Sequence, residues 1–134
     1  MKYLLDTNAW IEVINDPAGI VASRMSTKHV LEIAYNSISN GELFTGAFKS
    51  PHSALEILAI EQVVKQFQSF AFDDPCAEEY AEIRSHLEKI GQRIGPHDMQ
   101  IAGIARHHNL IVVTHNTREF SRVPGLAIED WQVP

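Results

Sequence analysis

The sequence predicts an α/β protein with a central, mostly parallel sheet of four to five short strands. Short apolar runs alternate along the chain with segments of helical periodicity, as they do where helices join parallel strands. The chain has 134 residues, of which 45% are hydrophobic and 21% are charged, and this is enough to fill one core. No linker rich in Gly, Ser or Pro divides it, so we expect one domain over residues 1–134.

The first fifty residues are predicted to contain two strands and the helices that follow them. Residues 3–5 form an apolar run that stops at a carboxylate, as a buried strand would. Residues 9–15 predict a short helix, and Asp16-Pro17 predicts the cap and first turn of a second. Residues 33–38 predict the next strand, and residues 39–42 the start of another helix.

The second half of the chain continues the alternation. Residues 70–72 predict a short strand, and Asp74-Pro75 begins a helix whose apolar positions step by three and four. Gly95-Pro96 begins a further helix. Residues 110–113 are the most strand-like run, and residues 127–129 predict a last edge strand.

A long helix is predicted between these halves, from Ser50-Pro51 to about Ser69. Its apolar residues cover more than one helical stripe, so one face can meet the core while the other meets a partner. We therefore expect a homodimer.

Charge and cysteine content restrict the function. The formal net charge is −6, which argues against a basic module that binds nucleic acid through its own positive surface. A single cysteine, Cys76, excludes a disulfide within the chain. The apolar runs fall far short of the roughly 20 residues that span a bilayer. We expect a soluble, cytoplasmic protein.

Four acids lie at the predicted element junctions: Asp6, Glu42, Asp98 and Glu119. Each has a local explanation, such as a capping box of Ser39 with Glu42 or an acid that favours a helix N-terminus. Two details favour a shared site instead. Asp98 lies beside the apolar side of its helix, and Gly46, one turn after Glu42, would let another backbone approach closely.

Such a cluster needs a counter-charge. Two carboxylates about 5 Å apart repel by about 3 kcal/mol at an effective dielectric near 20. Oxygen ligands suit hard cations such as Mg²⁺ or Mn²⁺, which take phosphate oxygens as further ligands. Phosphodiester hydrolysis is the natural use of such a site, and a bound cation would let an acidic protein hold an anionic strand.

Four motifs in order resemble the PIN-domain nucleases, in particular the VapC toxins of bacterial toxin–antitoxin pairs. They are the segments at residues 1–8, 41–50, 94–102 and 113–126, and Asp130-Trp131 also fits the usual end. The resemblance implies a three-layer α/β/α sandwich and a metal-dependent endoribonuclease that a cognate antitoxin holds inactive. It further implies that Asp6, Glu42 and Asp98 bind Mg²⁺ and that Glu119 or Asn116 completes the site.

The resemblance also assigns supporting roles. Thr114 is expected to hydrogen-bond a ligating carboxylate. Four basic residues lie in or beside the motifs and are expected to guide the RNA backbone, or else to be solvated surface charges: Lys49, Arg93, Arg118 and Arg122.

The sequence departs from the family pattern at three positions. Asn116 stands where many relatives have Asp, which leaves the fourth acid to Glu119. His97 replaces a more usual Asn, and His115 is a further histidine beside the last motif. No metal-ligand spacing joins the two histidines, so we expect plain loop residues.

Two alternatives remain from the sequence. The first is a catalytically inactive PIN-like module that binds RNA or protein, because Asn116 is not an acid. The second is a phosphatase or phospho-receiver with Asp6 as nucleophile. The phosphatase pattern wants a second Asp two positions on, where this chain has Asn8.

Overall fold

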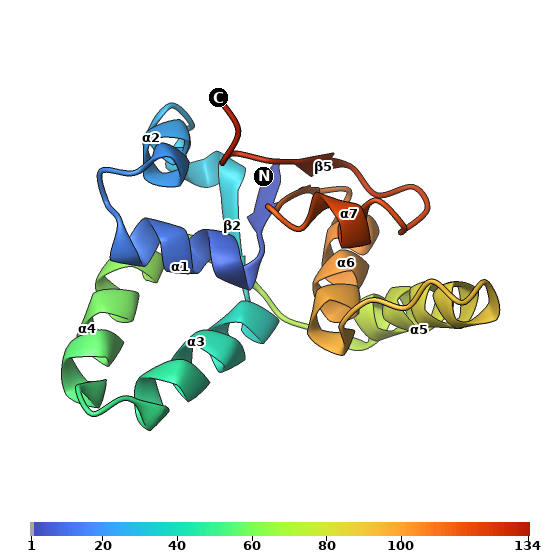
Figure 1. Cartoon of the computed structure of the whole chain (residues 1–134), viewed down its shortest axis with the longest axis horizontal. Coiled ribbons are helices and arrows are strands. Elements are labelled where there is room, and N and C mark those ends of the chain that lie inside the picture. Colours follow the sequence, from blue (N-terminus) through green and yellow to red (C-terminus); the bar gives the residue numbers. More distant parts are fainter. Residues whose placement is uncertain (1) are drawn as a thin grey trace.

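The computed structural model describes residues 2–134, and within them five parallel strands form one sheet in the order β3-β2-β1-β4-β5. Helices cover both faces of this sheet (Figure 1). The strands are β1 (Tyr3–Leu5), β2 (Ile33–Asn36), β3 (Gln68–Phe70), β4 (Ile111–Val113) and β5 (Ile128–Glu129). The predicted α/β fold with a parallel sheet of four to five strands is confirmed.

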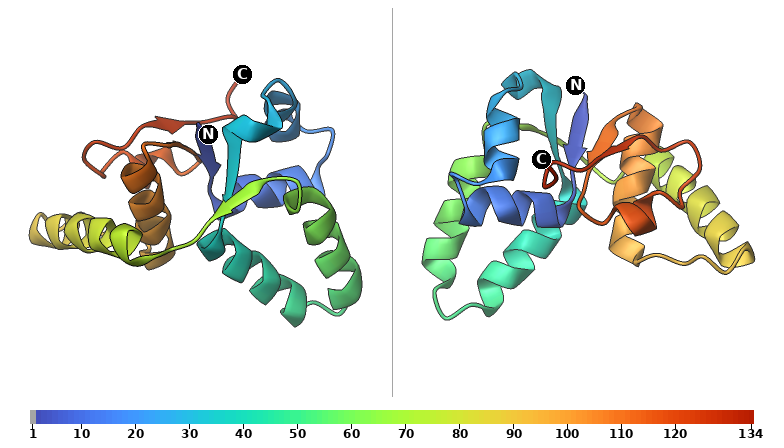
Figure 2. Two further views of the ribbon diagram at one scale, coloured as in Figure 1. Left: turned by 180° about the vertical axis from the view of Figure 1, so that it is seen from behind. Right: turned by 45° about the horizontal axis from the view of Figure 1, so that its top comes forward.

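The helices divide into two groups. One group is α1 (Thr7–Asn15), α2 (Ile20–Ser26), α3 (Ser37–Lys49) and α4 (Ser53–Val64), with a 3-10 turn at Val30–Glu32. The other is α5 (Asp74–Lys89), α6 (Pro96–His108) and the short α7 (Thr117–Phe120). Seen from behind, the two groups remain on opposite sides (Figure 2). Between residues 2 and 134, none of the helices is both long and apolar enough to cross a membrane.

Side-chain alternation along the strands produces a separate core on each face of the sheet. Leu4 and Val112 point to one side and pack with residues of α5 and α6. Leu5, Tyr35 and Val113 point to the other side and pack with residues of α1–α4. Burial on both faces explains why the strands read as continuous apolar runs in the sequence.

Several element boundaries differ from those that the sequence predicted. Asp16 ends α1 instead of capping α2, which begins after Gly19. The long helix predicted over residues 51–69 stops at Val64, because the chain turns there to place β3 at residues 68–70, two residues earlier than expected. The pairing of β3 with β2 fixes this position, and no local signal announces it.

The strand order predicts a ligand-binding site at the carboxyl ends of β1 and β4. The chain builds outward from β1 through β2 to β3 and then returns to place β4 on the other side of β1. In open parallel sheets, ligands bind beyond the carboxyl ends of the strands at this reversal. Asp6 follows β1 and Thr114 follows β4 at that point.

Candidate active site

Asp6 lies between the end of β1 and the start of α1. It is 3% exposed, and its Oδ1 accepts a hydrogen bond from the Ala9 backbone N–H at 2.8 Å, which caps the helix. Burial raises the pKa of Asp6, and the charges of Glu42 and Asp130 raise it further. Hydrogen bonds from Thr114 and Ala9 act in the opposite direction. The buried charge would therefore be stabilised by a cation.

Asp98 lies in the first turn of α6. Burial is the largest cause that raises the pKa of Asp98, to about 6. The charges of Asp6, Glu119 and Glu42 add to the rise, so Asp98 lies near enough to each of these acids to be repelled by it. A hydrogen bond from the Asn116 amide, 3.4 Å from Asp98 Oδ2, lowers the pKa in part.

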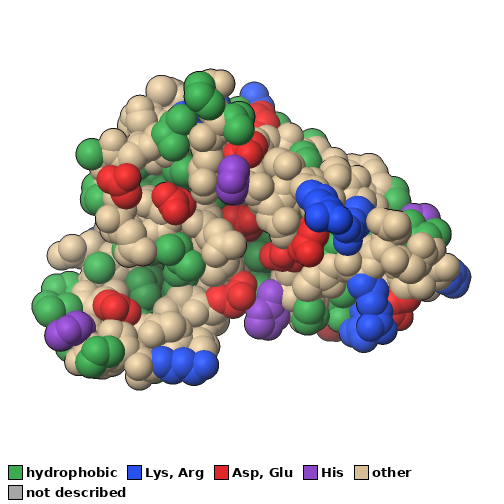
Figure 3. Space-filling view, viewed as in Figure 1, with side chains coloured by type: hydrophobic (Ala, Val, Ile, Leu, Met, Phe, Trp, Pro, Cys, Tyr) green, Lys and Arg blue, Asp and Glu red, His purple; other side chains and the backbone are tan. Residues whose placement is uncertain are grey.

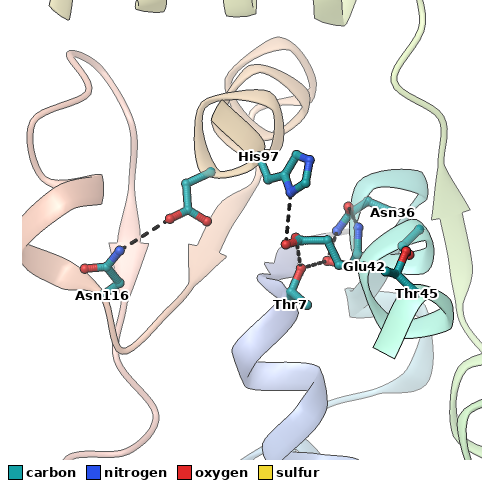
Figure 4. A network of polar contacts seen from close by, with 9 residues as sticks. Thr7, Asn36, Glu42, Thr45, His97 and Asn116 are labelled. Atoms are coloured by element: carbon teal, nitrogen blue, oxygen red, sulfur yellow. Dashed lines mark hydrogen bonds and ion pairs between the residues drawn. The ribbon is translucent and has the colours of Figure 1, made fainter. Parts of the chain in front are cut away.

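Glu42 reaches the site from α3. Its Oε1 accepts a hydrogen bond from the Thr7 hydroxyl at 2.6 Å, and its Oε2 lies 3.0 Å from His97 Nδ1 (Figure 4). The capping box of Ser39 with Glu42, the local alternative that the sequence left open, does not form. The helix begins earlier, at Ser37, because Asn36 caps it by accepting the Ser39 backbone N–H at 2.8 Å. Glu42 therefore lies in the second turn of α3, where its carboxylate is free to face the site.

The glycine expected to allow a close backbone approach beside Glu42 does not do so. A Cβ added to Gly46 would meet nothing within 4 Å. The close approach is at Gly103 in α6, where an added Cβ would lie 2.8 Å from the Cys76 carbonyl oxygen. Glu42 is directed by the hydrogen bonds of its own carboxylate rather than by Gly46.

Asn116 joins the acids on the other side of the site. Its Nδ2 donates to Glu119 Oε2 at 2.8 Å and to Asp98, and its backbone N–H donates to Thr114 Oγ1 at 2.9 Å. An aspartate here would add a fifth negative charge to Asp6, Glu42, Asp98 and Glu119, whereas the amide supplies two protons to its neighbours. Asn116 therefore orients Asp98 and Glu119.

Both histidines contact an acid. His97 is the second residue of α6 rather than a loop residue, which corrects the sequence-based expectation. His115 does lie in a loop, and its Nδ1 is 2.9 Å from Asp130 Oδ2. The expectation of plain loop residues missed both contacts, because each contact joins residues 15 or more positions apart in the sequence.

The four basic residues lie at different places relative to the acids. Arg118 and Arg122 lie in and just after α7, the helix that carries Glu119. Arg93 is exposed and its backbone carbonyl accepts a hydrogen bond from Arg122. Lys49 ends α3, about 10 Å along the helix from Glu42. On the face seen in Figure 3, side chains of Lys or Arg lie directly beside side chains of Asp or Glu.

Asp6, Glu42 and Asp98 line one open pocket of about 410 Å³, together with Thr7 and His97. All of the acids' donor atoms are oxygens, as a hard divalent cation requires. Within residues 2–134, however, no three His, Cys, Asp or Glu side chains stand close enough to hold one metal ion. The donor set fits such a cation in chemistry, but the side chains as they stand do not gather around a single ion.

Comparison with known proteins decides the family. Residues 3–126 match the PIN domain family model. The chain belongs to the PIN-domain family. This PIN domain is 37% identical over 131 residues to the tRNA(fMet)-specific endonuclease VapC of Shigella flexneri, with 98% of each chain covered. The predicted resemblance to VapC-type PIN domains is confirmed.

Solved structures agree with the family. The DNA-bound VapBC from Salmonella typhimurium matches this PIN domain with a TM-score of 0.92 and 34% identity over 98% of each chain. VapBC-5 from Mycobacterium tuberculosis, a member of the VapBC family of toxin–antitoxin systems, matches with a TM-score of 0.71 and 26% identity over 98% of each chain.

Proposed function

We propose that this chain is a metal-dependent endoribonuclease toxin that hydrolyses phosphodiester bonds in RNA and that a cognate antitoxin neutralises. The observation that carries the proposal is the convergence of Asp6, Glu42 and Asp98 on one pocket at the strand-order reversal. These acids come from the end of β1, from α3 and from α6. The names of the relatives supply the substrate class and the partner. The cytoplasm is the expected place of action.

Asp6, Glu42 and Asp98 would hold the cation, with Mg²⁺ the first choice and Mn²⁺ the second. When bound, the cation supplies charge neutralisation at the phosphate and lowers the pKa of a water. The raised pKa of Asp6 and of Asp98 agrees with this role, since both carboxylates are poorly stabilised without a counter-charge.

The remaining residues position these acids and the substrate. Thr114 hydrogen-bonds Asp6, and Asn116 holds Glu119 beside Asp98. Glu119 takes the place of the fourth acid. Arg118 and Arg122 lie on the side of Glu119 and are the best placed of the basic residues to guide an RNA strand toward the pocket.

Cleavage of a structured RNA by the purified chain tests the proposal. We expect cleavage with Mg²⁺ and none after EDTA treatment, and restored cleavage when Mg²⁺ is added back. Binding of RNA without cleavage under all of these conditions would instead identify an inactive binding module. A stable acyl-phosphate on Asp6 would identify a phosphatase or phospho-receiver.

A further inference from the structure

A chain of hydrogen bonds beneath Glu42 ends on one oxygen of its carboxylate. Asn36 Nδ2 lies 3.2 Å from Ser39 Oγ, Ser39 Oγ lies 3.0 Å from Thr7 Oγ1, and Thr7 Oγ1 lies 2.6 Å from Glu42 Oε1. Asn36 and Ser39 are fully buried. Thr7 reaches Glu42 across 35 positions of sequence, so the chain of bonds ties the start of α1 to α3 (Figure 4).

The direction of this chain is fixed by proton count. The Glu42 carboxylate only accepts, so Thr7 gives it the single proton of its hydroxyl. Ser39 must then donate to Thr7, and the Ser39 hydroxyl accepts from Asn36 Nδ2. The Asn36 amide cannot turn over, because its Oδ1 holds the Ser39 backbone N–H. All three donors therefore point toward Glu42, and aligned bonds strengthen one another.

The second oxygen of Glu42 has a different environment. Oε2 contacts His97 Nδ1, and the His97 side chain is 59% exposed. Contacts between exposed groups are weak, because water competes for both partners. Glu42 thus has one oxygen held by a buried network and one held by a side chain that solvent can replace.

We propose that Thr7 is a positioning residue that holds one oxygen of Glu42, and that His97 occupies the other oxygen until a divalent cation replaces it. This inference rests on the proposed metal site. Glu42 is engaged on both oxygens, and in residues 2–134 no three acids are already gathered for an ion.

Calorimetric titration of Mn²⁺ into the RNA-free, full-length chain tests the two halves of the proposal. Thr7→Val removes the hydroxyl at nearly constant shape, and we expect Mn²⁺ affinity to fall by about 10- to 100-fold, as for other outer-sphere partners. Thr7→Ser keeps the hydroxyl and is expected to restore affinity to within about threefold. His97→Ala removes the competing contact, and we expect affinity to rise severalfold, the worth of one hydrogen bond.

Thr45→Val is the matched control. Thr45 lies one turn beyond Glu42 on α3, and its hydroxyl donates only to the Gly41 carbonyl oxygen at 2.7 Å. Loss of that hydroxyl is expected to leave Mn²⁺ affinity unchanged. Thermal unfolding of each variant reports whether the fold is retained.

RNA cleavage gives a second measurement on the same variants. If Thr7 acts only by positioning Glu42, excess Mn²⁺ restores the kcat of Thr7→Val. The positioning role is overturned if Thr7→Val binds Mn²⁺ like the parent, or if Thr7→Ser binds as weakly as Thr7→Val. The role of His97 is overturned if His97→Ala weakens binding.

The experiment distinguishes failure of the proposed nuclease function from failure of the inference about Glu42. A parent chain that shows these affinity changes but cleaves no RNA contradicts the nuclease and supports the inference about Glu42. A parent that binds no Mn²⁺ overturns both.

Discussion

The two helical layers on either side of the sheet are packed to different degrees. In the layer of α5 and α6, the helices approach so closely that a Cβ on Gly103 would lie 3.0 Å from the Tyr80 backbone nitrogen. In the layer of α1–α4, a pocket of about 310 Å³ lies among α1, α3 and α4, and Phe48, Leu55 and Leu58 are exposed. We call the first layer closed for its tight helix contact, although Ile90 at the end of α5 is exposed, and the second layer open for its several exposed apolar side chains.

The difference matters because the site takes one acid from each layer. Asp98 comes from the closed layer, and Glu42 comes from the open one, with Asp6 between them on the sheet. Asp98 is held by its tightly packed helix together with the hydrogen bond from Asn116. The open layer relies on the hydrogen bonds of Thr7 and Ser39. The following predictions test this contrast, and they are ordered from the largest expected effect to the smallest.

Asp98→Ala is expected to abolish RNA cleavage while the fold is kept. Loss of a cation ligand removes several kcal/mol of transition-state stabilisation, which corresponds to a rate lower by about 10³ or more. Single-turnover cleavage with saturating Mg²⁺, alongside a circular dichroism spectrum, measures both properties. Parent-like cleavage by Asp98→Ala would show that Asp98 has no such role.

Gly103→Ala is expected to destabilise the fold by about 3 kcal/mol, because the added methyl overlaps backbone atoms that cannot move away. Gly41→Ala in the open layer is the control. A Cβ there meets nothing within 4 Å, so we expect a gain of about 0.5–1 kcal/mol from reduced backbone freedom of the unfolded chain. Urea unfolding compares the two, and equal effects would contradict the difference in packing.

The metal-free protein is expected to lose stability as pH rises through the range from about 4 to about 6. The pKa of Asp98 is raised from 3.8 to about 6 on folding, so the folded state holds this proton more tightly than the unfolded state does. The loss is on the order of 1–2 kcal/mol once solvent screening of this partly exposed group is counted.

Asp98→Asn is expected to weaken this pH dependence, leaving the part that comes from the raised pKa of Asp6, and to be more stable than the metal-free parent above pH 6. Thermal unfolding in EDTA across this pH range measures it. Parallel curves for parent and variant would assign the dependence to other groups.

The exposed side of α4 is expected to form a homodimer. Ile60 and Val64 of this helix are buried, whereas Leu55 and Leu58 are 70% and 53% exposed, as the two-sided apolar pattern predicted. Leu58→Ser is expected to weaken self-association about tenfold, the cost of a modest interface residue. Sedimentation velocity at micromolar concentration measures this, and a parent that is entirely monomeric would rule the homodimer out.

Local sequence signals gave the sheet and the approximate place of each acid. Asp6 follows an apolar run and Asp98 follows Gly95-Pro96, and both signals depend only on neighbours in the chain. Signals that depend on distant neighbours were missed. The assumption that Gly46 marked a close approach was wrong, because spacing cannot show which helix lies opposite a glycine.

The sequence by itself determined the alternation of strands and helices, the order of the acids, and the placement of Asp6 and Asp98 at element ends, since burial and capping act over a few residues. Only the tertiary structure decided where α4 stops, how Thr7 and His97 divide the two oxygens of Glu42, and how Asn116 joins Asp98 to Glu119. Those arrangements depend on how the two helical layers pack against the sheet, and this packing involves residues far apart in the sequence.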